Sequence, residues 1–260
     1  MLPTAGVPDP APTAERTDAL LTTAERDAFA RDGFVAVDRP IVPPDALAEA
    51  RVLLDELLGG QLPEGQVNDL GDAASGRILE VVRATDALPR LRRTAAFQRC
   101  RDVAAELLDV PVAPFYDHVI HKAPRNRAAT AWHQDTAYAP GEVFPPTAHV
   151  WLALQDVTVA TGCMQFVPGS HVRELPHRPR GGDPAAAALE AIGPDTSTAV
   201  ACPLPAGGVT VHHPGVLHHT GPNDSDGPRL AWILQFREEG TWGVRAWVPG
   251  PLRSLLRRRR

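Results

Sequence analysis

The chain has 260 residues, of which 43% are hydrophobic and 22% are charged, as in an ordinary globular protein. Its length fits one large domain, and no run approaches the ~20 apolar residues that a membrane-spanning helix needs. The net charge of −5 disfavours a general nucleic-acid-binding protein, and three distant cysteines disfavour a disulfide framework or a cysteine-based zinc site.

The N-terminal segment, residues 1–21, is rich in proline, alanine and threonine. It has neither the basic start nor the apolar stretch of a signal peptide, so we expect a flexible leader and a cytoplasmic protein. Residues 22–260 are expected to form a single domain, and the four arginines at 257–260 are interpreted as a solvated tail. We predict a small-molecule partner and neither nucleic acid nor membrane, while the oligomeric state stays open.

Three helices are predicted in the N-terminal half of the chain. The first begins near Thr22 or Thr23, either of which can cap it, and ends at Gly33, after which residues 34–37 are typical of a strand. The second spans residues 45–58, follows two prolines and carries an apolar stripe. A third spans residues 96–108. We expect these helices to form a layer that covers one side of another structure.

After Pro111 the sequence consists of short β-like runs separated by proline, glycine and asparagine. Many short strands with turns between them predict a sandwich or a barrel. The expected strands span residues 115–121, 131–135, 149–157, 163–167, 208–212 and 230–237. A charged segment, residues 172–197, interrupts this series and contains an alanine-rich piece, 184–192, which favours a short helix. An insertion of this length is expected to be a lid.

His133 and Asp135 have the clearest chemical meaning. Side chains alternate along a strand, so these two point to one face while Gln134 points to the other. With one more histidine they would give the two-histidine, one-carboxylate arrangement of non-haem Fe(II) oxygenases, which leaves metal positions open. Four distal histidines compete for this place: His212, His213, His218 and His219.

Several blocks of the chain resemble, in order and spacing, the phytanoyl-CoA dioxygenase family of Fe(II)- and 2-oxoglutarate-dependent oxygenases. They lie within residues 22–237, at 132–135, 150–157, 167–171, 208–213, 218–225 and 228–229. The resemblance implies a mainly β fold with flanking helices and a double-stranded β-helix (jelly-roll, cupin-like) core. It also implies Fe(II), 2-oxoglutarate as co-substrate, and O2 for the oxidation of a C–H bond in a small organic molecule.

The resemblance further implies roles for single residues. In the family the distal ligand precedes Ser or Thr, Gly, Pro and Asn, which selects His218 to join His133 and Asp135. Arg229 would bind the C5 carboxylate of 2-oxoglutarate, because a guanidinium offers a planar, permanently charged fork. Thr220 lies two residues after His218, on the same face of the strand, and would donate a hydrogen bond to that carboxylate.

Other positions also match the family. Gln134 and Trp151 correspond to residues close to the co-substrate, although Trp151 fits plain core packing equally well. Lys122 corresponds to a basic residue, expected to contact co-substrate or substrate or to lie at the surface. Four aromatic residues are candidates to line an apolar substrate pocket, with core packing as the alternative: Tyr138, Phe144, Trp242 and Trp247.

Asp135 also bears on the type of reaction, because family members that halogenate carry a small residue at this position. We therefore expect hydroxylation or a related oxidation. One alternative is a cupin-like isomerase, epimerase or lyase that does not use 2-oxoglutarate and so needs no Arg229. Another is a non-catalytic binding module, which would not need an intact metal triad. The family's role in bacterial secondary metabolism, together with the arginine-rich composition, favours a tailoring hydroxylase of natural products such as antibiotics.

Overall fold

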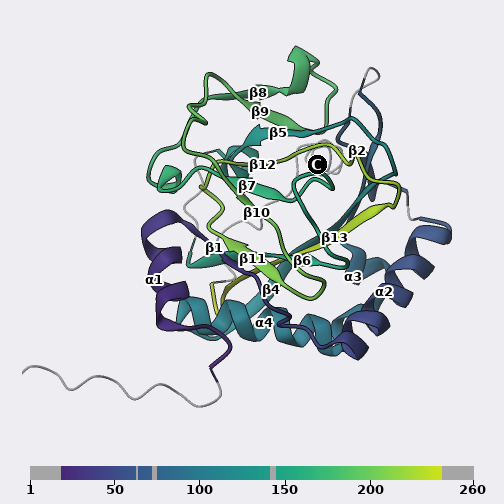
Figure 1. The fold of residues 1–260 in the computed structure, drawn as a ribbon, viewed down its shortest axis with the longest axis vertical. Helices are drawn as coiled ribbons and strands as arrows, with labels where there is room; N and C mark the ends of the chain where they lie inside the picture. Colours follow the sequence, from purple (N-terminus) through teal and green to yellow (C-terminus); the bar gives the residue numbers. More distant parts are fainter. Residues whose placement is uncertain (1–18, 63, 72–74, 141–144, 242–260) are drawn as a thin grey trace, which may run out of the picture.

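The computed structural model describes residues 19–62, 64–71, 75–140 and 145–241 (Figure 1). Within these ranges the strands form two main antiparallel sheets that face each other, so the predicted jelly-roll fold with flanking helices is confirmed. The seven-stranded sheet has, in spatial order, β1 (Phe34–Val37), β11 (Val209–His212), β6 (Thr147–Ala153), β13 (Arg229–Glu238), β4 (Val112–Lys122), β3 (Ile78–Val82) and β2 (Val67–Asp69).

Strand β13 lies near the middle of this sheet, between β6 and β4, and is buried except for its last residue. Its side chains alternate between two apolar environments, as expected for a strand covered on both faces. Leu230, Trp232 and Leu234 pack into the cluster that includes the helices. Ala231 and Ile233 pack into a second cluster between the two sheets. The inner face of β13 therefore points to the interior of the sandwich.

The helices cover the outer face of the large sheet (Figure 1). Thr22 caps the first one, as predicted, and forms a reciprocal capping box with Glu25, while Gly33 ends it with a positive φ of 81°. No helix in the described part of the chain is long and apolar enough to cross a membrane. The helices are α1 (Thr23–Asp32), α2 (Pro44–Gly59), α3 (Ala84–Ala87) and α4 (Ala95–Leu108), with 3-10 turns η1 (Pro89–Arg93), η2 (Asp135–Tyr138), η3 (Ser170–Val172) and η4 (Arg180–Gly182).

The smaller sheet closes the other side of the sandwich. Stacked rings of Phe34 and Phe166, with centroids 4.5 Å apart, join the two sheets. The strands of the small sheet are, in spatial order, β10 (Val200–Cys202), β7 (Met164–Phe166), β12 (His218–Thr220) and β5 (Thr130–His133). Strands β5 and β12 carry the two predicted histidine ligands, so the metal site belongs to this sheet.

The predicted helix at 184–192 is wrong. This part of the chain instead contributes β9 (Leu189–Ala191), which pairs with β8 (His177–Pro179) in a separate hairpin on the side of the molecule away from the helices (Figure 1). A helix of this length has little stability of its own, so pairing with β8 outweighs the helical preference of the alanines. The side chain of Asp183 also accepts a hydrogen bond from the backbone N–H of Ala185, which favours a turn.

Candidate metal centre

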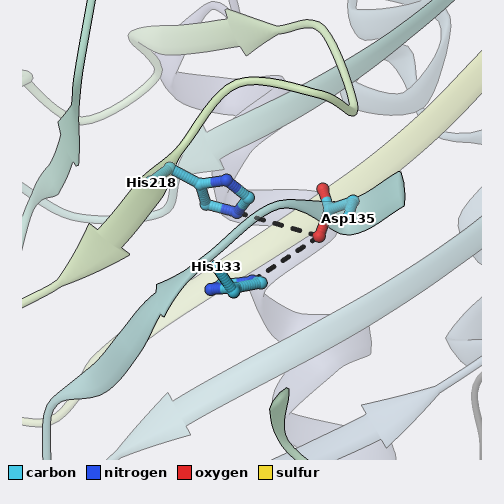
Figure 2. Close-up of side chains that lie close together, drawn as sticks. All are labelled: His133, Asp135 and His218. Atoms are coloured by element: carbon cyan, nitrogen blue, oxygen red, sulfur yellow. Dashed lines mark ion pairs between the residues drawn. The ribbon is translucent and has the colours of Figure 1, made fainter. Parts of the chain in front are cut away.

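The two histidine ligands lie directly opposite each other on neighbouring antiparallel strands. His133 ends β5 and His218 begins β12, and the register of the ladder pairs the two residues. Their rings lie 4.2 Å apart between centroids, and both side chains are buried. Figure 2 shows both rings turned toward the carboxylate of Asp135. The structure thus brings His218, and not its neighbour, to the predicted site.

Asp135 lies just beyond the end of β5, as the first residue of η2. The intervening Gln134 keeps an extended backbone, with φ −118° and ψ 135°, so the predicted alternation still places Asp135 on the face of His133. Oδ1 of Asp135 lies 3.5 Å from Nε2 of His133 and 3.8 Å from Nε2 of His218. Such spacing allows three ligand atoms to bind one metal ion.

Backbone hydrogen bonds orient both imidazoles. Nδ1 of His133 donates to the carbonyl oxygen of Ala131 at 2.8 Å, and Nδ1 of His218 donates to that of Val216 at 2.9 Å. In each ring the proton is held on Nδ1, so Nε2 presents its lone pair to the centre of the site. A metal-binding histidine typically has this arrangement, with its other nitrogen donating to a fixed acceptor.

The charges in the site also suit a metal ion. Burial and the nearby His133 hold the pKa of His218 well below its usual range, so its ring is neutral and free to bind. Burial alone would raise the pKa of Asp135, but the nearby imidazole of His218 and hydrogen bonds from three other histidines hold it well below the usual value. The carboxylate is therefore ionised.

A second pair of histidines, His149 on β6 and His212 on β11, binds the other carboxylate oxygen. Oδ2 of Asp135 lies 2.8 Å from Nδ1 of His149 and 3.3 Å from Nε2 of His212. These three residues also come close enough to hold a metal. In the sequence, His212 was one of the four histidines that compete for the distal ligand position, and nothing singled out His149.

The imidazole nitrogens of His149 and His212 that do not face Asp135 indicate which of the two candidate groups is the better metal site. Nε2 of His149 and Nδ1 of His212 are buried, and neither finds a hydrogen-bond partner among the described residues. If these rings bound a metal, each would leave a buried N–H without an acceptor, which is costly. If His149 and His212 instead donate to Asp135, the other nitrogen of each ring carries only an unused lone pair. His133 and His218 are thus the better ligands, and His149 and His212 hold the carboxylate.

The other distal histidines point elsewhere. The ring of His219 stacks on Trp132, with centroids 4.8 Å apart, and its Nδ1 donates to the carbonyl oxygen of Thr130. Nδ1 of His213 accepts a hydrogen bond from the backbone N–H of Gly215. Neither residue belongs to either metal-binding group, which agrees with the strand alternation that separates His218 from His219.

The ligands open onto a pocket between the two sheets, and Arg229 lies in its wall. Arg229 begins β13 on the inner face of the large sheet and is 1% exposed. All three guanidinium nitrogens are buried and lack hydrogen-bond partners in the described ranges, while the charge lies 5.8 Å from the centre of the Trp151 ring. Burial lowers the pKa of Arg229 to about 10, so it remains a cation. A buried cation of this kind needs an anionic partner.

Thr220 and Trp151 also line this pocket, as predicted. Lys122 is fully buried beside them, which rules out the surface interpretation. Its Nζ donates to Oγ1 of Thr220 at 3.0 Å and to the carbonyl oxygen of Gly221 at 2.5 Å. Burial, reinforced by the charge of Arg229, lowers the pKa of Lys122 to about 5. Lys122 therefore supports the strand that carries Thr220. In the ladder between β4 and β13, Lys122 itself lies opposite Arg229.

Gln134 does not line the pocket, in contrast to the prediction that it binds the co-substrate. Its amide nitrogen donates to the carbonyl oxygens of Gly215 and Arg173, and its oxygen accepts from the backbone N–H of Leu175. The Gln134 side chain points to the face opposite that of His133, where its hydrogen bonds connect loops beside the small sheet. Strand alternation predicts this direction of the Gln134 side chain, whereas the match to the family position does not.

Of the aromatic residues proposed for the substrate pocket, Tyr138 lies in its wall. Its hydroxyl accepts a hydrogen bond from the backbone N–H of Leu189 at 3.0 Å, which links the pocket to the segment predicted as a lid. Ala187 and Ala188 of that segment also line the pocket. Three other predicted residues lie outside the described ranges: Phe144, Trp242 and Trp247.

The pocket has a further polar wall that the sequence analysis missed. It consists of Asn68 on β2, Glu80 on β3 and His118 on β4. Strands β2 and β3 were not predicted at all, because their few residues show no clear alternation, so nothing indicated that these side chains would approach the metal ligands.

Comparison with known proteins agrees with this site. The family model described as phytanoyl-CoA dioxygenase (PhyH) matches residues 29–231. Phytanoyl-CoA dioxygenase domain-containing protein 1 of Bos taurus is 30% identical over 196 residues, which cover 72% of this chain and 63% of the relative. The chain thus aligns with less than two thirds of that relative's length.

Two solved structures share the fold. EvdO2 from Micromonospora carbonacea var. aurantiaca, complexed with 2-oxoglutarate, is 29% identical with a TM-score of 0.71, covering 83% of this chain and 90% of that one. The epimerase SnoN, in complex with Fe3+, alpha ketoglutarate and nogalamycin RO, is 29% identical with a TM-score of 0.65, covering 83% and 82%.

Proposed function

Because the chain belongs to the phytanoyl-CoA dioxygenase family, we propose that it is a non-haem Fe(II)- and 2-oxoglutarate-dependent oxygenase acting on a C–H bond of a small organic molecule. The observation that carries the proposal is the coincidence, in one pocket, of two histidines and an ionised aspartate with a buried cation that has no partner among the described residues. The first group suits a metal, and the second suits a carboxylate.

His133, Asp135 and His218 would hold the metal. Their two imidazole nitrogens and single carboxylate oxygen form one face of a coordination sphere and leave the opposite positions open. When bound, ferrous iron with 2-oxoglutarate would activate O2, which is the oxidant both for the C–H bond and for the conversion of the co-substrate to succinate and CO2. The chain supplies orientation and a pocket with buried, water-poor walls.

Arg229 and Thr220 would hold the far carboxylate of 2-oxoglutarate. A guanidinium binds a carboxylate through two parallel hydrogen bonds, and the three unpaired nitrogens of Arg229 are available for this. The ring of Trp151 beside the guanidinium limits its movement. An isomerase or lyase that does not use 2-oxoglutarate gives no reason for a buried, unpaired arginine in this wall, so we favour the oxygenase.

We further propose hydroxylation or a related oxidation as the reaction, in bacterial secondary metabolism. Asp135 occupies the position that a halide would need, which argues against halogenation. The support for the metabolic role is the similarity to SnoN, whose structure contains nogalamycin RO, and to EvdO2. The hairpin β8–β9, within residues 172–197, would act as a lid, because Ala187 and Ala188 line the pocket.

The proposal is tested by adding Fe(II) and 2-oxoglutarate to the purified protein without oxygen and recording the visible spectrum. We expect a weak charge-transfer band, and then succinate when oxygen is admitted with candidate substrates. The absence of both the band and succinate would overturn the proposal. A panel of metabolites, read out as substrate-dependent succinate, would then identify the substrate.

A further inference from the structure

The polar wall formed by Asn68, Glu80 and His118 has no part in the proposed binding of metal and co-substrate. All three residues line the same pocket as the metal ligands, although they come from β2, β3 and β4 of the large sheet. Glu80 is only 7% exposed, and a carboxylate so far buried must be compensated by hydrogen bonds. Its partners therefore indicate what the wall can bind.

Both oxygens of the Glu80 carboxylate accept a hydrogen bond. Oε1 accepts from Nδ1 of His118 at 2.5 Å, and Oε2 accepts from the amide of Asn68 at 2.8 Å. The bond to Oε1 holds a proton on Nδ1 of His118, so in the neutral tautomer Nε2 carries the lone pair and can accept a hydrogen bond. None of the described residues donates to this Nε2.

The register of the strands places this acceptor apart from Arg229. Arg229 pairs with Lys122 at the end of β4, whereas His118 lies further along the same face of β4, opposite Ile233. Ile120 lies between the two basic residues on that face. The inner face of the sheet thus presents a cation at one end, apolar side chains in the middle, and a neutral acceptor at the other end.

The acceptor also lies near the metal ligands. Glu80, His118, His133 and Tyr138 all line the same pocket. Tyr138 packs edge-on against His133, with ring centroids 6.2 Å apart. Glu80 and the ligand His133 therefore face the same part of the pocket.

We propose that the Glu80–His118 pair is the substrate-recognition element and that it takes a neutral alcohol, whose hydroxyl group donates to Nε2 of His118. The inference rests on the proposed oxygenase function. Each oxygen of Glu80 already accepts one hydrogen bond within the wall, so we assign the contact with the ligand to the imidazole lone pair, which accepts a single hydrogen bond, as a hydroxyl group donates one. A carbon skeleton lying on Ile120 and Ile233 would then present a C–H bond to the metal site.

The first experiment tests the state of the imidazole. In protein that contains nitrogen-15-labelled histidine, Zn(II) and 2-oxoglutarate, the NMR spectrum should show His118 protonated on Nδ1 alone, with a free lone pair on Nε2. In Glu80→Gln the new side-chain amide can donate as well as accept, so the proton should spread over both ring nitrogens. A wild-type His118 protonated on Nε2 would overturn the proposal.

The second experiment tests the ligand class with a matched pair of probes, cyclohexanol and cyclohexyl methyl ether, titrated into the Zn(II)-loaded protein and followed by ligand NMR. The alcohol carries the hydrogen-bond donor that the ether lacks. We expect the wild type to bind the alcohol about 3 to 10 times more tightly, the range of one neutral hydrogen bond. His118→Phe should abolish this preference but leave the affinity for the ether.

His121→Phe is the matched control, because His121 lies on the same strand but on its other face. It should keep the preference for the alcohol. The proposal is wrong if the wild type shows no preference or if His118→Phe keeps it. Zn(II) supports no oxygen chemistry, so this result is independent of turnover, whereas failure of the oxygenase function would appear as missing succinate with Fe(II).

Discussion

Nδ1 of His149 donates a hydrogen bond to Oδ2 of Asp135 at 2.8 Å, on the side of the carboxylate that faces away from His133 and His218. His212 approaches the same oxygen at 3.3 Å. With Oδ2 engaged by the two histidines, Oδ1 is the oxygen that would bind the metal, so the aspartate would supply one ligand atom. This would leave more of the coordination sphere to co-substrate and oxygen.

His149→Phe should weaken metal binding by about 10- to 100-fold, the usual effect of removing a residue that orients a ligand. Phenylalanine keeps the aromatic volume but cannot donate to Oδ2, which leaves the carboxylate free to rotate. Titration with Co(II), followed by its visible absorption, measures both the affinity and the coordination geometry. We expect a changed spectrum as well as a weaker affinity.

His213→Phe serves as the control for this change, since His213 is also a partly buried histidine but makes no contact with Asp135 in the described structure. Its Co(II) affinity and spectrum should match those of the wild type. Equal weakening in both variants would mean that His149 acts only through general stability.

His218→Ala should abolish iron binding, because it removes one of two nitrogen ligands. His219→Ala should bind iron nearly as the wild type does, because the ring of His219 stacks on Trp132 and belongs to neither metal-binding group. Iron bound per protein, measured after gel filtration, distinguishes the two variants. The reverse result would assign the ligand to His219.

Arg229→Gln should raise the 2-oxoglutarate concentration needed for half-maximal binding by about 10- to 100-fold, the loss expected for a charge-assisted hydrogen bond. The charge-transfer band of the Fe(II) complex, titrated with 2-oxoglutarate, gives this value directly. Unchanged dependence would remove Arg229 from the co-substrate site, while iron affinity, measured separately, should stay near that of the wild type.

The same residue should limit the stability of the protein without ligands. Arg229 is a buried cation that lacks an anionic partner in the described ranges, and replacing such a charge by an apolar side chain of similar length commonly stabilises a fold. When both are free of ligands, Arg229→Met should therefore have a free energy of unfolding about 1 to 4 kcal/mol higher than that of the wild type. Added 2-oxoglutarate should stabilise the wild type and not the variant.

Lys122 predicts a pH dependence of stability. Burial and the charge of Arg229 lower its pKa in the folded protein to about 5, from 10.5 in the unfolded chain. Between these values the unfolded chain binds one more proton, so stability rises with pH and is lost as pH falls toward about 5. Urea unfolding at pH 6 and pH 9 should show a larger gain for the wild type than for Lys122→Met. An equal gain would show that Lys122 stays charged when folded.

Much of the fold could be predicted from local patterns. The capping residue Thr22, the terminating Gly33 and the apolar stripe of α2 located the first helices, and the β-like run at residues 230–237 located β13. Short strands such as β2 and β10 were missed, because three residues carry no periodic signal and their pairing depends on distant partners. For the same reason the pairing of β9 with β8 was not foreseen.

The site was predictable where chemistry restricts the residue type. Two histidines and an aspartate for the metal, and an arginine for a carboxylate, stood out in the sequence. His149 and Glu80 did not, because their role arises from direction and neighbours: His149 matters only because β6 places it beside Asp135, and Glu80 only because β3 lies beside β4. The direction of the Gln134 side chain was foreseen from strand alternation, whereas its role was not.

The pairing of His133 with His218 also has a consequence for folding. The site draws on β5 and β12, and the side chain of Gln134 bridges to a carbonyl oxygen 81 residues away, while Lys122 and Thr220 bond across 98 residues. Contacts of such long range form late, because closing large loops costs chain entropy before any contact can compensate for it. The metal site is therefore complete only when nearly the whole chain has folded, so the rate at which metal binds to refolding protein measures the last steps of folding.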